Sequence, residues 1–257
     1  MKKKAVLRVA LSTGTFTEFL NCISQMGQAR QSSCVYVANV HMTVEAWHDN
    51  SYAKVINAAD IITPDGMPMV KCLELFYGIK QDRIDGMRLF PELLKHAENK
   101  GLSVFFYGST LEVLDAILDH VRCDYPNLTI AGHHSPPFRP HSHEEKKNII
   151  RLINESMANI VFVALGCPKQ EKWIDSMKGK VNAVMIGVGG AFPVYAGLQK
   201  RAPEWMQKAS LEWLFRLYQE PRRLFKRYLI TNSIFLFLIT REILSKHIFT
   251  KCYSSNS

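Results

Sequence analysis

The stretch Ala59-Asp60-Ile61-Ile62-Thr63-Pro64-Asp65-Gly66-Met67-Pro68 predicts a buried strand that ends in a turn carrying a carboxylate. The two isoleucines form the strand, a proline and a glycine mark the turn, and helical apolar spacing begins at Met69. Open α/β sheets bind their ligands at the carboxyl edge of the strands, so Asp65 is a candidate general base. Asp65 or Thr63 could instead cap the following helix. The local pattern leaves both interpretations open.

Apolar strand-like runs alternate with amphipathic helical stretches over the first 198 residues. This alternation predicts an α/β fold with a Rossmann-like, mostly parallel sheet flanked by helices. Further strands are expected over residues 6–11, 34–38, 103–107, 128–131, 160–165 and 182–186. Beyond them the pattern is helical without strands. We therefore expect an α/β domain over residues 1–198 and a helical C-terminal appendage over residues 199–257.

Polar or glycine-containing turns follow several of these strands. Asn39 and His41 follow the second strand and are expected at the same sheet edge as the carboxylate turn. Gly108 could bring backbone N–H groups against a phosphate, although a plain turn is the simpler reading of one glycine. Gly166-Cys167-Pro168-Lys169-Gln170-Glu171 places three polar side chains at another strand end. The run Gly187-Val188-Gly189-Gly190 lies too late for a dinucleotide fingerprint, which disfavours a Rossmann dehydrogenase.

Composition indicates one large α/β domain with a terminal extension, because 47% of the 257 residues are hydrophobic. The six cysteines are scattered without a CxxC pair, which predicts reduced thiols and a cytoplasmic chain. The basic start Met1-Lys2-Lys3-Lys4 precedes an apolar stretch that is broken at Arg8, so no export signal is predicted.

Metal-ligand patterns are weak. His133, His134, His141 and His143 crowd into a proline-containing segment without helical i,i+4 spacing. None of the nine aspartates stands two residues from another, so the Asp-x-Asp pair of many metal-dependent sugar-nucleotide enzymes is absent. We therefore predict no metal and no cofactor. Lys, Arg and backbone N–H groups would neutralise any diphosphate.

The appendage carries most of the net charge of +9, because residues 199–251 contain 11 Lys and Arg against four Glu. A helix expected to begin at Pro221 interleaves these cations with Leu, Phe and Tyr. The apolar run over residues 234–239 is far shorter than the ~20 residues that span a bilayer. The pattern favours a segment lying on an anionic membrane surface. An amphipathic helix packed on the domain is the alternative.

Taken together, several motifs between about Val37 and Tyr228 resemble the bacterial WecG/TagA/CpsF family of glycosyltransferases (glycosyltransferase family 26). The motifs are Thr63-Pro64-Asp65-Gly66-Met67-Pro68, Gln81-Asp82-Arg83-Ile84-Asp85-Gly86, Phe106-Tyr107-Gly108, Ser135-Pro136-Pro137-Phe138, Gly166-Cys167-Pro168-Lys169-Gln170-Glu171, Gly187-Val188-Gly189-Gly190-Ala191-Phe192, Arg201-Ala202-Pro203-Glu204-Trp205, Leu211-Glu212-Trp213-Leu214-Phe215-Arg216-Leu217 and Glu220-Pro221-Arg222-Arg223.

The resemblance implies an inverting, metal-independent enzyme in which Asp65 is the base. It also implies that Asn39 and Arg83 line the pocket and that Gln170 contacts substrate. Groups that would approach or neutralise the diphosphate are Arg216, Arg222, Arg223, Lys169 and the N–H groups at Gly108, Gly166 and Gly189. Where many relatives have Asp after the Gly-Ala-Phe stretch, this chain has Pro193. The donor sugar is therefore not inferred from better-known members.

We predict a transferase that moves an N-acetylhexosamine, its uronic acid or a hexose from a UDP-sugar to a polyprenyl-diphosphate-linked sugar. Its product would serve a bacterial cell-surface polysaccharide such as teichoic acid, capsule or exopolysaccharide. The expected partners are the UDP-sugar donor, the lipid-linked acceptor and the inner face of the plasma membrane, with no nucleic acid; a homo-oligomer is left open. The alternatives are a membrane- or nucleic-acid-binding module without catalysis and a nucleotide-dependent oxidoreductase or methyltransferase.

Overall fold

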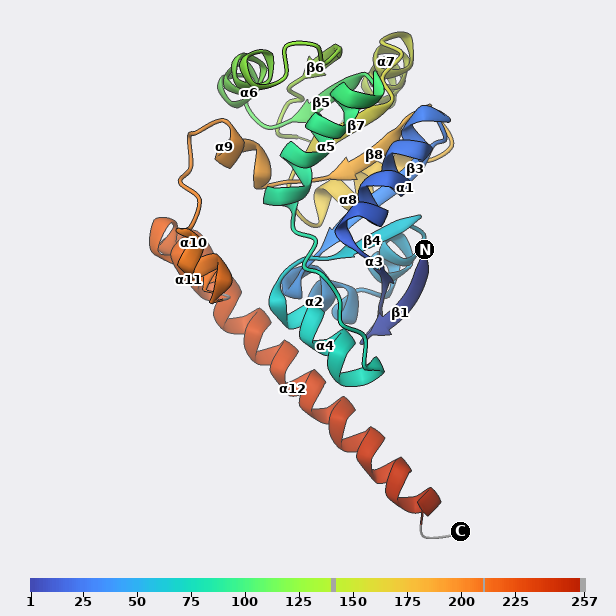
Figure 1. Ribbon diagram of the computed structural model, residues 1–257, viewed down its shortest axis with the longest axis vertical. Helices are drawn as coiled ribbons and strands as arrows, with labels where there is room; N and C mark the ends of the chain where they lie inside the picture. The colour runs from blue at the N-terminus through green and yellow to red at the C-terminus, as the bar shows by residue number, and fades with distance from the viewer. Residues whose placement is uncertain (140–141, 210, 255–257) are drawn as a thin grey trace.

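The computed structural model describes residues 1–139, 142–209 and 211–254. Its centre is a six-stranded sheet in which every neighbouring pair of strands is parallel (Figure 1). The strand order is β4-β3-β8-β7-β5-β6. The strands are β3 (Ser33–Ala38), β4 (Ile61–Pro64), β5 (Val104–Gly108), β6 (Ile130–His134), β7 (Ile160–Ala164) and β8 (Val184–Gly187). The prediction of a mostly parallel α/β sheet is confirmed.

Helices cover both faces of this sheet because the strands are apolar on both sides. On β3, for example, Val35 and Val37 face one core and Tyr36 faces the other. The first core is closed by α1 (Phe16–Gln28), α5 (Gly86–Lys100), α6 (Leu111–Asp124) and α9 (Ala191–Tyr195). The second is closed by α2 (Val40–His48), α3 (Asn50–Asn57), α4 (Met67–Tyr77), α7 (His143–Glu155) and α8 (Lys169–Met177).

The chain begins with an antiparallel hairpin, β1 (Lys2–Val6) and β2 (Val9–Thr13), which forms a separate two-stranded sheet. The expectation of one strand over residues 6–11 is therefore wrong. Leu7 has a φ of 54°, so the chain reverses there in the left-handed region. The hairpin is fastened to the main sheet where Ile62 N–H donates to Ser12 Oγ at 3.1 Å.

The topology predicts where a ligand would bind. Strands β3 and β8 are neighbours, but the chain leaves β3 toward α2 on one face and leaves β8 toward α9 on the other. Ligands of open α/β sheets bind in the crevice at such a switch point, outside the carboxyl ends of the strands. Asn39 follows β3, Gly189 follows β8, and Asp65 follows the adjacent edge strand β4.

The C-terminal part consists of α10 (Glu204–Lys208), α11 (Glu212–Gln219) and the long helix α12 (Pro221–Ser254), which runs beneath α2 and α4 in Figure 1. Over Pro221–Ser245 this helix is long and apolar enough to cross a membrane, judged by length and composition. The apolar run at residues 234–239 is short, as expected, but it lies within a longer helical stretch with few charges, so a spanning length arises that the run alone did not predict. In the fold, α12 packs against the domain through Leu224, Thr231, Phe235, Leu238 and Ile239.

Candidate active site

Asp65 lies in a turn that backbone hydrogen bonds hold in place. Its N–H donates to the carbonyl of Ala38 at 2.8 Å, and the neighbouring Pro64 carbonyl accepts from Ile84 N–H at 3.0 Å. Helix α4 begins after Gly66, which has a φ of 89°, and no side chain caps it. The capping interpretation of Asp65 and Thr63 is therefore wrong, and Thr63 Oγ1 instead donates to the Ile84 carbonyl at 2.9 Å. The Asp65 carboxylate has no structural task in its own helix.

The surroundings of Asp65 raise its pKa to about 7. Burial is the largest cause, and the negative charges of Asp85 and Glu212 act in the same direction. The cations Arg83 and Arg216 act against them. A carboxylate with this pKa can accept and release a proton near neutral pH, which is what a general base must do.

Arg83 is held by carboxylates from two parts of the chain. Its Nε donates to Asp85 Oδ2 at 3.1 Å, and its Nη2 lies 3.3 Å from Glu212 Oε2 on α11. Asp85 is only 4% exposed and also accepts from Arg88 N–H, which caps α5. Arg201 Nη2 lies 3.8 Å from the second oxygen of Asp85. These ion pairs join the appendage to the loop that carries Arg83.

Asp85 and Glu212 lie within motifs noted in the sequence but were not among the predicted site residues. Their spacing from predicted arginines could have indicated both. Asp85 stands two residues after Arg83, and Glu212 stands one helical turn before Arg216 on the same helix.

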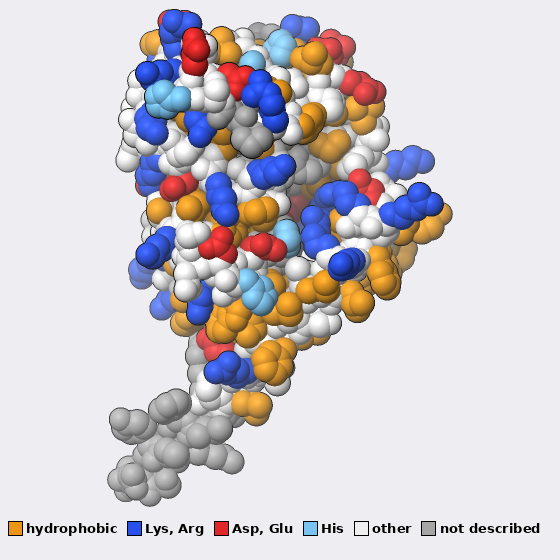
Figure 2. Space-filling model, turned by 180° about the vertical axis from the view of Figure 1, so that it is seen from behind, with side chains coloured by type: hydrophobic (Ala, Val, Ile, Leu, Met, Phe, Trp, Pro, Cys, Tyr) orange, Lys and Arg blue, Asp and Glu red, His pale blue; other side chains and the backbone are white. Residues whose placement is uncertain are grey.

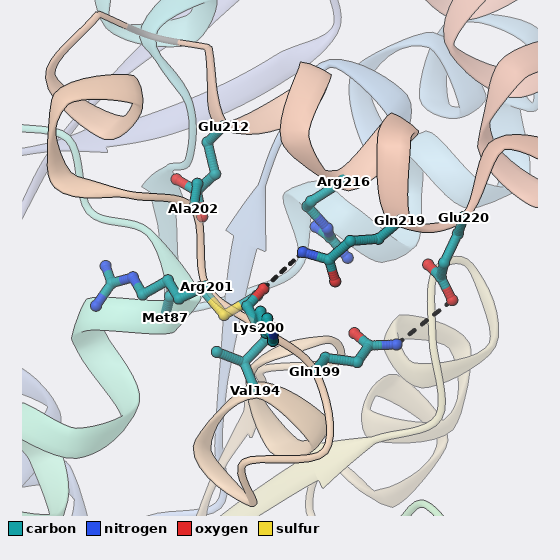
Figure 3. A pocket seen from close by; sticks show the side chains of 10 residues that line it. All are labelled: Met87, Val194, Gln199, Lys200, Arg201, Ala202, Glu212, Arg216, Gln219 and Glu220. Atoms are coloured by element: carbon teal, nitrogen blue, oxygen red, sulfur yellow. Dashed lines mark hydrogen bonds between the residues drawn. The ribbon is translucent and has the colours of Figure 1, made fainter.

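Arg216 is half-buried and projects from α11 toward the carboxyl edge of the sheet (Figure 3). Its guanidinium lies against Gly190, where an added Cβ would come within 2.9 Å of Nη2. No ion pair joins Arg216 to any side chain in the described part of the chain. It borders a seam between the appendage and the domain that is lined by Met87, Val194, Gln199, Lys200, Arg201, Ala202, Glu212, Gln219 and Glu220. Arg216 is thus a cation near Asp65 that remains available to an anion.

Gln170 is buried beneath the glycine loop that follows β8. Its Nε2 donates to the carboxylate of Glu171 at 2.6 Å, and Tyr52 OH donates to the other carboxylate oxygen at 3.0 Å. An added Cβ at Gly187 or Gly189 would lie 2.9 or 3.2 Å from the Gln170 amide. The amide therefore supports the loop from below. Its own oxygen is buried and has no hydrogen-bond partner among the described residues.

Asn39, Gly108 and Gly166 each have a local structural task. Asn39 Oδ1 caps α2 by accepting from Met42 N–H at 3.1 Å. Gly108 has a φ of 106°, and an added Cβ there would lie 2.4 Å from the Ala164 carbonyl, so the close approach of β5 and β7 requires glycine. Gly166 has a φ of 78° and open space around it. Their contacts with substrate remain predictions.

The remaining predicted cations lie at the surface. Lys169 is exposed at the start of α8. Arg222 and Arg223 are exposed in the first turn of α12, and Arg223 pairs with Glu220. The structure therefore brings Asp65, Arg83 and Arg216 together. Lys169, Arg222 and Arg223 lie outside that cluster.

The histidines that were considered as metal ligands do not form a metal site in the described residues. His133 and His134 belong to β6, His143 begins α7, and His141 lies outside the described residues. Within the described ranges, no three side chains of His, Cys, Asp and Glu come together as a metal site would need. The charged groups around Asp65 are instead carboxylates that alternate with guanidiniums.

Comparison with known proteins identifies the family. Residues 4–248 match the model of the glycosyl transferase WecG/TagA/CpsF family. A relative from Bacillus subtilis (strain 168), named N-acetylglucosaminyldiphosphoundecaprenol N-acetyl-beta-D-mannosaminyltransferase, is 30% identical over 98% of this chain and 96% of its own length. Proteins of the same name from Bacillus spizizenii and Staphylococcus aureus (strain MW2) are 35% and 31% identical over 74% and 83% of the chain, and over 72% and 82% of their own lengths. The chain carrying the Asp65 cluster therefore belongs to the WecG/TagA/CpsF family and is a glycosyltransferase.

Proposed function

We propose that the protein transfers an N-acetylmannosaminyl group from a UDP-linked donor to N-acetylglucosaminyl-diphosphoundecaprenol. The observation that carries the proposal is the Asp65 carboxylate at the carboxyl edge of the sheet, with a pKa of about 7 and with Arg83 and Arg216 facing it. The sugar and the acceptor come from the names of the relatives, the first of which is matched over 96% of its length. The UDP moiety comes from the resemblance of the motifs.

In the proposed mechanism, Asp65 removes the proton from an acceptor hydroxyl as that oxygen attacks the anomeric carbon of the donor. The new glycosidic bond forms as the bond to the nucleotide diphosphate breaks, so the configuration at this carbon inverts. The departing diphosphate carries the displaced electron pair. Arg216, which has no carboxylate partner among the described side chains, would stabilise that negative charge. Lys169, which follows β7 and lies outside the cluster around Asp65, could add to it only if the diphosphate extends along the sheet edge.

The acceptor's lipid also suggests a role for the appendage. Exposed aromatic and aliphatic side chains gather on α10, α11 and α12, where Arg222, Arg223 and Lys226 accompany them. Figure 2 shows hydrophobic side chains along the lower edge of one face, bordered by Lys and Arg. We propose that residues 199–257 form an appendage that lies on the inner face of the plasma membrane beside the α/β domain, residues 1–198.

Incubation with UDP-linked sugars and a short-chain analogue of the acceptor tests the proposal. We expect transfer from UDP-N-acetylmannosamine in preference to UDP-N-acetylglucosamine or UDP-glucose. Transfer should persist in excess EDTA, because guanidinium groups rather than a metal neutralise the diphosphate. Preference for another donor would reject the sugar assignment. Loss of activity in EDTA with recovery in Mg²⁺ would reject the metal-independent mechanism.

The pH dependence of transfer should report Asp65. We expect kcat/KM to rise with pH through about 7 as its carboxyl loses a proton. Asp85→Asn removes a neighbouring negative charge while an asparagine oxygen can still cap α5, so the midpoint should move to lower pH. Glu212→Gln should move it in the same direction. Unchanged midpoints in both variants would show that another group controls the profile.

A further inference from the structure

Three side chains enclose the glycine loop that follows β8. Gln170 packs beneath Gly187 and Gly189, at 2.9 and 3.2 Å from the Cβ positions that these residues lack. Arg216 covers Gly190 from the appendage side, and Met87 Cε lies 3.7 Å from the Cβ position of Gly190. Gln170 is buried and hydrogen-bonded to Glu171, so it supports the loop at Gly187 and Gly189, next to the residue that Arg216 covers.

Gly190 is not required by its backbone conformation. Its φ of −66° and ψ of −3° lie in the right-handed helical region, which alanine adopts without strain. Its two glycine neighbours along the loop, Gly189 with a φ of 47° and Gly187 against Gln170, have other reasons to be glycine. What a methyl group at residue 190 would meet is the tip of Arg216, with Nη2 at 2.9 Å and Cζ at 3.7 Å.

We propose that Gly190 is a positioning residue that provides the seat for the Arg216 guanidinium and thereby holds this cation of the appendage beside Asp65. The inference rests on the proposed function, because the seated guanidinium would receive the departing diphosphate. Gly190 itself contributes no charge or hydrogen-bonding side chain. Its role is to leave room, so that an arginine from α11 can reach over the end of β8.

The charged groups around Asp65 allow the position of Arg216 to be followed through the pKa of Asp65. Arg83 and Asp85 come from the loop before α5, while Glu212 and Arg216 come from α11. Displacing Arg216 alone removes one cation and leaves both carboxylates, so ionisation of Asp65 becomes less favourable. The expected change is opposite in sign to that of Asp85→Asn or Glu212→Gln.

Gly190→Ala tests this seat in the full-length protein. We expect kcat/KM to fall about tenfold or more, as for the loss of a charge-assisted contact, and the acidic limb of the pH profile to move to higher pH. Arg216→Ala should produce the same two changes. Hydrogen exchange at the amides of α11 should accelerate in Gly190→Ala, because the contact of Arg216 with the loop no longer helps to hold that helix. Global thermal stability should change little, because the two hydrophobic cores are untouched.

A double-mutant cycle supplies the control. Gly190→Ala should have almost no further effect on kcat/KM or the pH profile in an Arg216→Ala background, and its full effect in an Arg222→Ala background. Wild-type kinetics and exchange in Gly190→Ala, or an undiminished effect without Arg216, would overturn the proposal. If the wild-type protein transfers none of the sugars, the proposed function fails, and exchange at α11 still decides whether Gly190 seats the appendage.

Discussion

Asp65→Asn is expected to lower the turnover of sugar transfer by about 100-fold or more, the scale typical of losing a general base. The amide has nearly the same shape as the carboxylate but cannot accept the acceptor's proton. The backbone bonds of the turn, from Asp65 N–H to Ala38 and from Ile84 N–H to Pro64, do not involve the side chain. Binding of UDP, measured by calorimetry, should therefore stay close to that of the wild type.

The matched control is Asp60→Asn, which changes a carboxylate at the opposite end of the same strand. Asp60 accepts from Cys34 N–H at 2.8 Å and pairs with Lys178, away from the carboxyl edge. Turnover of this variant should remain near that of the wild type. If Asp65→Asn also keeps turnover within about threefold, Asp65 is not the base.

Asp65→Asn should also change the free energy of unfolding, by an amount that depends on pH. The folded state raises the Asp65 pKa from the ordinary 3.8 to about 7, so ionising the group in this window opposes folding. Below the ordinary pKa both states hold the proton and no difference arises. Above about pH 7 the wild type bears the full cost of the buried charge. Above this pH, Asp65→Asn should melt at the same temperature as the wild type or higher. Such a result would show that the catalytic carboxylate lowers the stability of the fold.

Loss of membrane binding is the second large effect that we expect. Phe225, Leu229 and Leu236 share one face of α12, because four and seven residues separate them, and this face points away from the domain. Changing Leu229 and Leu236 to serine removes two side chains that could each gain about 1.5–3 kcal/mol by burial in lipid. Sedimentation with vesicles of anionic phospholipid should weaken by about 100-fold or more.

Leu75→Ser with Leu111→Ser is the control pair for this experiment. Leu75 and Leu111 are 60% and 62% exposed, compared with 59% and 64% for Leu229 and Leu236, but they lie on α4 and α6. Vesicle binding should survive these changes. Equal loss in both pairs would indicate nonspecific adhesion, and undiminished binding of the α12 pair would exclude this face as the tether. Deleting the chain after Lys200 would be less informative, because it would uncover the core that Phe235 and Ile239 help to close.

The sequence predicted the elements whose signals are local. Apolar runs predicted all six strands of the parallel sheet, and the position of Asp65 after β4 followed from one turn. The prediction of one strand over residues 6–11 fails at Leu7, where a residue other than glycine adopts a positive φ and divides the expected strand into a hairpin. The identity of the residue, leucine, does not predict a positive φ, because tertiary packing selects that conformation.

The sequence did not predict all the residues that make up the site, because they come together through contacts between distant parts of the chain. Glu212 and Arg83 are separated by 129 residues yet lie 3.3 Å apart, and no periodic pattern encodes such a pair. The glycines of the β8 loop were recognised as a motif, but the reasons differ by residue. Gly189 accommodates Gln170, whereas Gly190 accommodates Arg216. Only the folded chain shows which side chain fills which space.

The packing of α12 against α2 has a consequence for the choice of acceptor. Arg227 acts electrostatically on His41, so the first turns of α12 lie near the start of α2, where Asn39 borders the crevice. Phe225 and Leu229 stand on the outer side of α12, about one helix diameter of 10 Å away. If these side chains lie at the lipid surface, the crevice beside Asn39 would lie close to the bilayer. We therefore expect an acceptor with few sugar units between its diphosphate and the reacting hydroxyl to reach Asp65 more readily than one with a long glycan.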